Sequence, residues 1–303
     1  MPKPHVTIGI CTYRRPMLLG RLLDGIAKLT TGDGVTFSCA VVDNDAAASA
    51  QAQVEAFAAA SGITIRYAVE PARNFALVRN RVVGLAEGDF LAFVDDDEVP
   101  VPEWLSQLLR VQASTQADGV LGPVRPYFDQ PPPQWILDSK LCERPVHPTG
   151  MVMPWSKCRT GNVLLRLSLF RAGGLEFDPA FASGGEDVDF FKRASRAGHT
   201  FVWCEEAPAY ELVPPERLRK SYFLRRGLHQ GRISLKYDVD RLTTATRLAL
   251  GVRSAAALSA YTVALPFLAL RGFAPVMKYL VKDSHHLGRM MGLLQFGRDQ
   301  RNF

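Results

Sequence analysis

Cysteine is scarce in this sequence, and its arrangement gives no metal site and no disulfide framework. The 303 residues contain five cysteines, which are Cys11, Cys39, Cys142, Cys158 and Cys204. No two of them have the spacing of a zinc-ligand pair and their number is odd, so we expect reduced thiols in a cytosolic compartment. The first residues enter a strand pattern without a charged and then apolar leader, so we do not expect secretion.

Glycine-rich phosphate loops are also missing. No motif of the Rossmann or P-loop type follows the first apolar run, Val6–Cys11. A nucleotide bound by this chain must therefore be held by carboxylates and a metal ion. Internal repeats are absent, and low-complexity sequence is confined to Pro131–Pro133. A hydrophobic content of 47% and a charged content of 22% are ordinary for a folded protein.

Acidic residues are few at the C-terminal end of the chain. Residues 214–303 carry 16 Lys and Arg against 5 Asp and Glu, a balance of +11, and the other 20 basic and 25 acidic residues give residues 1–213 a balance of −5. A basic segment of this kind implies an anionic partner, which is nucleic acid, anionic lipid or a phosphorylated substrate. We expect residues 1–213 to form the catalytic domain and residues 214–303 to form a basic helical extension.

Two apolar stretches lie inside this basic extension. Ser254–Leu270 is uncharged, but its 17 residues are just under the length that spans a bilayer, and Pro266 interrupts it. Phe273–Phe296 mixes apolar and basic residues at helical spacing, as expected of a helix in the membrane interface. The alternative is a pair of helices packed on the catalytic domain. The excess of positive charge favours association with an anionic membrane surface.

Apolar runs alternate with helical patterns through the first part of the chain. The predicted strands are Val6–Cys11, Cys39–Val42, Ile63–Val69, Phe90–Val94, Val120–Val124 and Val163–Leu165, and helices are predicted over about 18–26, 46–60, 75–86, 103–112 and 186–197. This alternation predicts an α/β fold, with a mostly parallel sheet flanked by helices. Residues 126–160 are rich in proline, and their Trp135 and Trp155 belong either to a plain surface loop or to an element that stacks on a sugar ring.

Four consecutive acids, Asp95, Asp96, Asp97 and Glu98, follow the predicted strand Phe90–Val94. Open α/β sheets place their ligands at the C-terminal ends of strands. Adjacent negative charges repel one another, so the cluster is stable mainly around a cation, and oxygen ligands favour Mg²⁺ or Mn²⁺. The alternative is a solvated acidic turn, and the position after a buried strand favours the metal site.

A second acidic pair opens the predicted helix at 186–197. Gly184 and Gly185 allow a sharp turn before Glu186 and Asp187. Acids in a first helical turn are stabilised by the helix dipole without any catalytic role. Adjacent helical residues project about 100° apart, however, so one acid can act as a general base while the other is held by the loop.

In this order and spacing, the motifs resemble the family 2 glycosyltransferases, inverting enzymes with the GT-A fold that use nucleotide-diphosphosugars. The resemblance covers about residues 5–225. Its motifs are Cys11–Arg15, Val42–Asn44, Asn74, Arg79 with Asn80, Asp95–Asp97, Gly161 with Asn162, and Gly185–Asp187. The segment Glu211–Arg217 looks most like bacterial exopolysaccharide enzymes of the succinoglycan glucosyltransferase type. The family's A-R-N element reads Val78-Arg79-Asn80 here, a mild departure.

The resemblance implies a role for each motif. The implied nucleotide-binding residues are Thr12, Tyr13, Arg15, Asp43, Asn74, Arg79, Asp95 and Asp96, with Asp43 on the uracil. Asp97 would bind the metal ion with Asp95 nearer the ribose, and Asp187 would be the catalytic base beside Glu186. Many relatives add a histidine to the metal, but residues 203–217 contain none, so Glu211 is the candidate third ligand. Gly161, Asn162, Trp155 and Arg217 are assigned to the acceptor or the diphosphate.

The chain is therefore predicted to be an inverting glycosyltransferase that moves a sugar from a UDP-sugar to a polyprenyl-diphosphate-linked saccharide in bacterial exopolysaccharide or cell-surface polysaccharide synthesis. We expect it at the cytoplasmic face of the inner membrane, peripheral or monotopic. One alternative is a metal-dependent nucleotidyltransferase, although the early glycine-rich, lysine-bearing loop of such enzymes is missing. The other is a nucleic-acid-binding module that uses the basic extension. Its long uncharged stretches argue against that function, and we expect no nucleic-acid partner.

Overall fold

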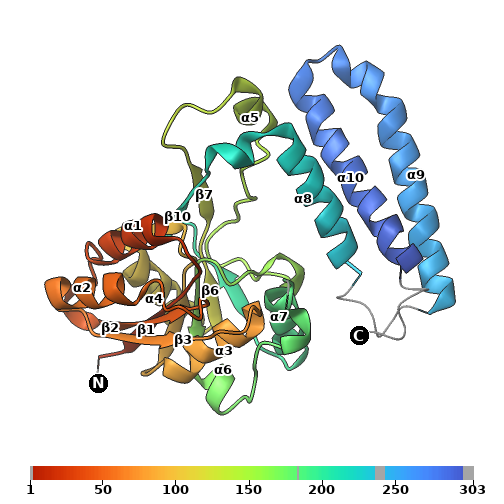
Figure 1. Ribbon diagram of the computed structural model, residues 1–303. Coiled ribbons are helices and arrows are strands. Elements are labelled where there is room, and N and C mark those ends of the chain that lie inside the picture. Colours follow the sequence, from red (N-terminus) through yellow and green to blue (C-terminus); the bar gives the residue numbers. More distant parts are fainter. Residues whose placement is uncertain (1–2, 183, 236–242, 296–303) are drawn as a thin grey trace. The chain divides into compact units, whose positions relative to one another are not determined.

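The computed structural model describes residues 3–182, 184–235 and 243–295 (Figure 1). The chain divides into two compact units. The first consists of Met1–Tyr127 and Arg144–Leu212, and the second of Phe128–Glu143 and Val213–Phe303. Sequence analysis assigned all of residues 1–213 to one domain, whereas the short segment Phe128–Glu143 belongs to the second unit.

The first unit is built on a seven-stranded sheet with the strand order β3-β2-β1-β4-β8-β6-β9. The strands are β1 (His5–Thr12), β2 (Thr36–Asp43), β3 (Ile65–Val69), β4 (Phe90–Phe93), β6 (Gly119–Leu121), β8 (Val163–Arg166) and β9 (Phe201–Trp203). All neighbouring pairs are parallel except those of β8, which runs antiparallel to both β4 and β6. The predicted mostly parallel α/β sheet is confirmed, and the reversed direction of β8 is new.

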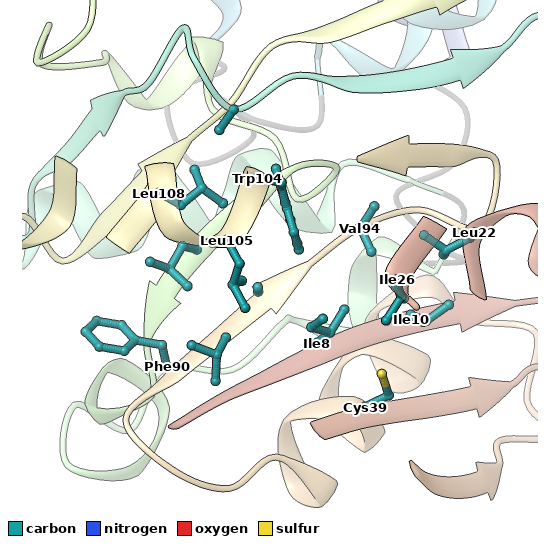
Figure 2. Close-up of a cluster of buried hydrophobic side chains, with 14 of the residues drawn as sticks. Ile8, Ile10, Leu22, Ile26, Cys39, Phe90, Val94, Trp104, Leu105 and Leu108 are labelled. Atoms are coloured by element: carbon teal, nitrogen blue, oxygen red, sulfur yellow. The ribbon is translucent and has the colours of Figure 1, made fainter. Parts of the chain in front are cut away.

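Helices cover both faces of this sheet. They are α1 (Pro16–Ile26), α2 (Gln51–Ser61), α3 (Phe75–Leu85), α4 (Trp104–Thr115), the short α6 (Ser168–Arg171) and α7 (Glu186–Arg196). Alternate residues of each strand point to opposite faces, so Ala92 of β4 lies in one apolar cluster and Leu91 and Phe93 lie in the other. Figure 2 shows the first cluster, where α1 and α4 cover Ile8 and Ile10 of β1.

A second, three-stranded sheet has the order β5-β10-β7. It consists of β5 (Glu98–Pro100), β7 (Val124–Tyr127) and β10 (Ala209–Leu212), with β10 parallel to β7 and antiparallel to β5. The single predicted strand Val120–Val124 is wrong, because Gly122 and Pro123 separate β6 from β7 and the two strands join different sheets. This small sheet begins directly after the acidic cluster, so it positions the last of the four acids.

The second unit is helical. Its elements are α5 (Gln134–Ser139), a 3-10 turn at Pro215–Leu218, α8 (Lys220–Ile233), α9 (Thr244–Ala269) and α10 (Phe273–Gln295). A small core forms around Ile136, Phe223 and Met277, from α5, α8 and α10. The Trp135 ring meets the Phe223 ring edge to face at 5.8 Å, so this tryptophan of the proline-rich segment serves packing.

Glycines allow α8 and α10 to pack with their backbones in contact. Gly227 and Gly231 lie four residues apart on α8, and Gly288 and Gly292 lie four residues apart on α10. A Cβ atom on Gly231 would lie 2.0 Å from the carbonyl oxygen of His285, and a Cβ atom on Gly288 would lie 2.0 Å from that of Leu228. No side chain fits at either position unless the helices separate.

Among the described residues, α9 alone is long and apolar enough to cross a membrane by length and composition. Only 6% of its most apolar 18-residue window is buried, and Pro266 lies inside the helix. Large apolar side chains are exposed along it and just beyond its end, at Leu248, Val252, Val263, Phe267 and Leu270. This exposed surface fits a membrane-associating extension.

Candidate active site

The polar ends of β1 and β4 meet at one edge of the large sheet. The two strands are parallel neighbours, with Gly9 paired to Phe93, so the residues that follow each strand come together. Thr12 ends β1, and Asp95, Asp96 and Asp97 fill the turn between β4 and β5. The fold thus brings two of the predicted motifs to one place.

Asp96 connects these two strand ends. Its Oδ2 accepts a hydrogen bond from Oγ1 of Thr12, and its Oδ1 accepts one from Nη1 of Arg15, both at 2.9 Å. Burial raises the pKa of Asp96, while the charge of Arg15 lowers it. Thr12 and Asp96 are both buried. The predicted nucleotide contacts of their polar groups are therefore replaced by contacts inside the protein, where they fix the loop.

Arg15 also reaches the next acid of the cluster. Its Nη1 lies 3.4 Å from Oδ2 of Asp97, and the guanidinium remains half-exposed. Arg15 therefore binds the buried Asp96 from the solvent side and places a positive charge beside Asp97. This position suits its predicted contact with a nucleotide.

Asp95 and Glu98 border the same small space. The Asp95 side chain is 45% exposed, whereas Glu98 is only 1% exposed. A Cβ atom on Gly161 would lie 3.0 Å from Oδ2 of Asp95 and 2.9 Å from Oε1 of Glu98. Burial raises the pKa of Glu98 well above its usual range, and the charge of Asp95 adds to the shift. Sequence analysis gave no role of its own to Glu98, although it noted the run of four acids.

Glu211 lies across the small sheet from Glu98. The two residues are opposite each other in the antiparallel pairing of β10 with β5. Nη2 of Arg144 donates a hydrogen bond to Oε2 of Glu211 at 2.6 Å. Arg144 thus places a positive charge among several acids. No sequence signal pointed to it, because it stands 67 residues before its partner in a proline-rich stretch.

Arg79 lies between the acids after β4 and the acids that open α7. Its guanidinium donates to Oε1 of Glu186 and lies 3.8 Å from Oδ1 of Asp95. Burial acts to lower the pKa of Arg79, but the charges of Glu186 and the other neighbouring acids together outweigh it, and the pKa is raised. Arg79 therefore remains charged and is mostly buried, and its predicted contact with the nucleotide or its pocket stays a prediction.

The two acids of α7 have different partners and different exposure. The Glu186 side chain is 4% exposed and pairs with Arg79, and burial raises its pKa. The Asp187 side chain is 18% exposed, with Nε of Arg159 at 3.9 Å from its Oδ2. Gly185 precedes them with φ at 97°, which places the sharp turn where two glycines were expected. Glu186 is thus buried in an ion pair, and Asp187 is the more exposed of the two acids.

Cys11 lies beside Arg79 and these acids. Burial raises the pKa of its thiol to about 12, and the charge of Arg79 only partly opposes this shift. The thiol is therefore protonated at neutral pH, and no nucleophilic role is assigned to it.

The tyrosine of the first motif is flanked by two arginines. The guanidiniums of Arg14 and Arg73 lie 5.3 and 5.1 Å from the centroid of the Tyr13 ring, and Arg73 also donates a hydrogen bond to the Tyr13 hydroxyl. Arg14 is in turn held by Asp45 at 2.8 Å. Sequence analysis named Tyr13 but missed both arginines. They would add positive charge around a nucleotide placed there.

Asp43 is fully buried and cannot contact uracil as expected. Its Oδ1 accepts a hydrogen bond from the Asp45 backbone at 2.9 Å, and its Oδ2 accepts from the Ala50 backbone at 2.8 Å and the Tyr67 hydroxyl at 3.0 Å. Both oxygens thus hold the loop after β2. The residue is a structural part of the site wall.

Asn162 and Asn74 are also used inside the protein. Asn162 is fully buried, accepts from Nε1 of Trp104 at 2.7 Å and donates to the carbonyls of Pro123 and Ala207. Its polar atoms are thus occupied inside the protein, which gives no support to its predicted contact with acceptor or diphosphate. Asn74 caps α3 by accepting from the Ala76 backbone, and it donates to the Pro179 carbonyl. Asn74 thus serves as a helix cap, and its expected nucleotide contact stays a prediction.

The remaining acceptor candidates lie in different environments. Trp155 is half-buried against the core, with Nζ of Lys192 at 5.7 Å from its ring centroid. Gly161 lies against the acids, as described above. Arg217 lies in the second unit, in the turn Pro215–Leu218. Its contact with a diphosphate stays a prediction.

The acid cluster has suitable chemistry for a hard divalent cation. In residues 3–182, 184–235 and 243–295, no three His, Cys, Asp or Glu side chains form a group that could hold a metal by themselves. The donors after β4 are nonetheless all carboxylate oxygens, and Oε1 of Glu98 is buried with no hydrogen-bond partner. Such donors fit Mg²⁺ or Mn²⁺, and Mg²⁺ commonly takes one or two carboxylates plus substrate phosphates.

Sequence comparison finds relatives along nearly the whole chain. The sequence model of the family described as Glycosyl transferase family 2 matches residues 7–168. Succinoglycan biosynthesis protein ExoM of Rhizobium meliloti (strain 1021) is 33% identical over 298 residues, covering 96% of this chain and 93% of that protein. Validoxylamine A glucosyltransferase of Streptomyces hygroscopicus subsp. limoneus is 27% identical over 246 residues, 72% of this chain and 53% of that enzyme.

Solved structures share the fold at low identity. Mannosyltransferase PcManGT from Pyrobaculum calidifontis, in complex with GDP-Man and Mn²⁺, superposes with a TM-score of 0.64 at 16% identity, covering 97% of this chain and 88% of that one. S. aureus TarS 1–349 in complex with UDP-GlcNAc gives 0.54 at 15% identity, with 96% and 92% covered. These likenesses concern the α/β architecture.

Proposed function

Since the chain belongs to glycosyltransferase family 2 and has the GT-A fold, it is a glycosyltransferase, and we propose that it transfers a sugar from a UDP-sugar to a lipid-linked saccharide. Membership of this family excludes the alternative hypothesis of a nucleotidyltransferase. The similarity to a protein named for succinoglycan biosynthesis supports a saccharide acceptor in polysaccharide synthesis. The UDP-GlcNAc and GDP-Man complexes of structural neighbours support a nucleotide-sugar donor.

The donor is proposed to lie against the ends of β1 and β4. Arg15 and the arginine-flanked ring of Tyr13 supply the exposed groups for the nucleotide. Asp95 and Asp97 are the residues that would hold a Mg²⁺ or Mn²⁺ ion, which when bound neutralises the departing diphosphate. Thr12 and Asp96 act indirectly, because their hydrogen bond fixes the loop that carries these groups.

Asp187 is proposed as the general base. The reaction is a single displacement at the anomeric carbon with inversion, in which the acceptor hydroxyl attacks and the nucleoside diphosphate leaves. Asp187 takes the hydroxyl proton on a carboxylate oxygen as the new glycosidic bond forms. Glu186 holds Arg79 instead of contacting substrate, because it is buried and paired.

The position of Arg79 carries this assignment. One guanidinium contacts both Asp95, in the donor motif, and Glu186, next to the proposed base. Asp95 and Glu186 are 91 residues apart in sequence. Their common contact with Arg79 supports a base beside the donor motif, as a displacement at the donor's anomeric carbon requires.

The acceptor is proposed to be carried by lipid at an anionic membrane surface. The apolar side chains exposed on α9 and the basic balance of residues 214–303 support this placement. The UDP moiety of the donor and the growing saccharide would then meet at the cytoplasmic face of the bacterial inner membrane. Arg217 is a candidate for the acceptor diphosphate in this arrangement.

The test is a calorimetric titration of UDP with and without Mn²⁺. We expect binding that depends on Mn²⁺ in the wild type, is lost in Asp97→Ala, and persists in Asp24→Ala, which removes an exposed acid of α1. Absence of UDP binding in every protein would overturn the donor assignment. Binding that ignores Mn²⁺ and Asp97 would keep the nucleotide and overturn the cation site.

A further inference from the structure

Glu98 is a buried acid that the proposed mechanism leaves without a role. It opens β5, one residue after Asp97, and is 1% exposed. Its Oε2 lies 3.4 Å from the backbone nitrogen of Asp95, whereas its Oε1 is buried with no hydrogen-bond partner. Burying a carboxylate oxygen without a hydrogen-bond partner costs free energy, so this oxygen calls for an explanation, such as a bound ion.

The unpartnered oxygen points to the edge of the donor motif. Oε1 of Glu98 and Oδ2 of Asp95 lie 2.9 and 3.0 Å from one point, the place that a Cβ atom on Gly161 would occupy. Any other residue at 161 would fill this point. The absent side chain of Gly161 therefore leaves a small space between two carboxylates that come from different ends of one turn.

Glu211, the third ligand suggested by sequence, is less suited to this role. Its Oε2 is bound by Nη2 of Arg144 at 2.6 Å, so a guanidinium already balances its charge. Glu98 lies directly opposite on β5; the charge of Arg144 acts on it too, but its Oε1 has no hydrogen-bond partner. Of the two paired strand residues, Glu98 is the one with an oxygen available to a cation.

We propose that Glu98 contributes its unpartnered oxygen to the divalent-cation site beside Asp95, and that Gly161 keeps the space for the ion open. This inference rests on the proposed function, because the cation would arrive with the donor diphosphate. A cation there would pair the unpartnered oxygen and neutralise an acid next to two others. The diphosphate would complete the coordination, as is usual for Mg²⁺.

The test measures Mn²⁺ directly. The electron paramagnetic resonance signal of free Mn²⁺ is titrated with protein in the presence of UDP, which reports cation affinity without any turnover. We expect Glu98→Gln to weaken Mn²⁺ binding about tenfold or more, in the range seen for residues that support a metal site. Glu103→Gln, an exposed glutamate five positions along the chain, serves as the matched control and retains wild-type affinity.

Two further variants separate the possible outcomes. Gly161→Ala is expected to weaken Mn²⁺ binding as well, because its Cβ atom enters the space between the two oxygens. Glu211→Gln is expected to have a smaller effect than Glu98→Gln. Mn²⁺ affinity within twofold of wild type in a folded Glu98→Gln protein overturns the inference, as does a larger loss in Glu211→Gln.

Failure of the inference is distinct from failure of the proposed function. If the wild type binds neither UDP nor Mn²⁺, the donor site itself is wrong. If the wild type binds both and Glu98→Gln is unchanged, the donor site stands and Glu98 is excluded. The circular dichroism spectrum of each variant confirms that it is folded. Gly161→Ala is an independent test, because it fills the proposed ion space without changing either carboxylate.

Discussion

Two neighbouring acids in the first turn of α7 have different surroundings. Glu186 is enclosed and bound to Arg79, whereas Asp187 is more exposed and lies near Arg159. Adjacent residues of a helix face different directions, so one turn can supply both a positioning group and a reactive group. In the proposed mechanism, Glu186 holds the donor side of the site and Asp187 accepts a proton.

Asp187→Asn is expected to lower kcat by about 10² to 10⁴, the usual contribution of a general base. UDP affinity is expected to be unchanged, because the donor is held by other residues. Asp189→Asn, in the same helical turn, removes only the pairing with Arg193 at 2.7 Å and should leave kcat near wild type. Sugar transfer and UDP titration on both variants check this, and equal loss of kcat in the two would remove Asp187 from the role.

Residue types at the site could be predicted from the sequence, but the direction of each side chain could not. Asp43, which ends β2, and Asn162, which directly precedes β8, look like ligand-binding residues because they belong to motifs of the family. Their oxygens are instead used by nearby backbone and ring N–H groups that only the folded chain brings together. Arg144 was missed for the converse reason, since nothing local to its sequence indicates that β10 lies beside it.

At the scale of the elements, the crossing of α8 and α10 depends on positions without side chains. Gly231→Ala is expected to destabilise the fold by about 1–3 kcal/mol, because its Cβ atom overlaps the His285 carbonyl and forces the helices apart. Gly251→Ala, in α9, is the matched control. Its Cβ atom would lie 3.9 Å from the nearest atom, in Leu293, so the change should stabilise by up to about 1 kcal/mol through helix propensity.

Thermal unfolding of the two variants under identical conditions measures this difference. Opposite signs are expected for the same chemical change, and the sign depends only on what each glycine faces. Stabilisation by both substitutions would contradict the close packing of α8 on α10.

The long elements were predictable because their signals are local. Strands β1 to β4 are mostly apolar, and helices α1, α3, α4 and α7 follow periodic patterns or capping turns. The direction of β8 has no such signal, since an apolar strand reads the same when its neighbours run parallel or antiparallel. Strands β5, β7 and β10 have only three or four residues each and mix polar with apolar side chains, so their pairing depends on tertiary contacts.

At the scale of the whole molecule, the charge and the exposed apolar surface of the second unit should govern membrane binding. Replacing Val263 and Phe267 by serine is expected to weaken binding to vesicles of anionic lipid at least tenfold at both low and high salt. Each apolar side chain contributes about 1.5–3 kcal/mol when fully removed from water. Phe75→Ser, which changes an exposed phenylalanine of the first unit, is the control and should bind as the wild type does.

Vesicle co-sedimentation across a salt series makes the measurement. Lys278→Gln should reduce binding mainly at low salt, because exposed charges are screened as salt rises. Wild-type binding that disappears completely at high salt would show that charge alone attaches the protein. In that case the apolar surface of α9 would need a different partner.

The segment Phe128–Glu143 belongs to the second unit, and this has a consequence for folding during synthesis. Its Trp135 and Ile136 pack with Phe223 and Met277, which leave the ribosome much later. At roughly 5–20 residues per second, these apolar side chains wait several seconds for their partners. A fragment ending near residue 213 would never supply them, so production of the catalytic unit alone calls for a short polar linker in place of residues 128–143.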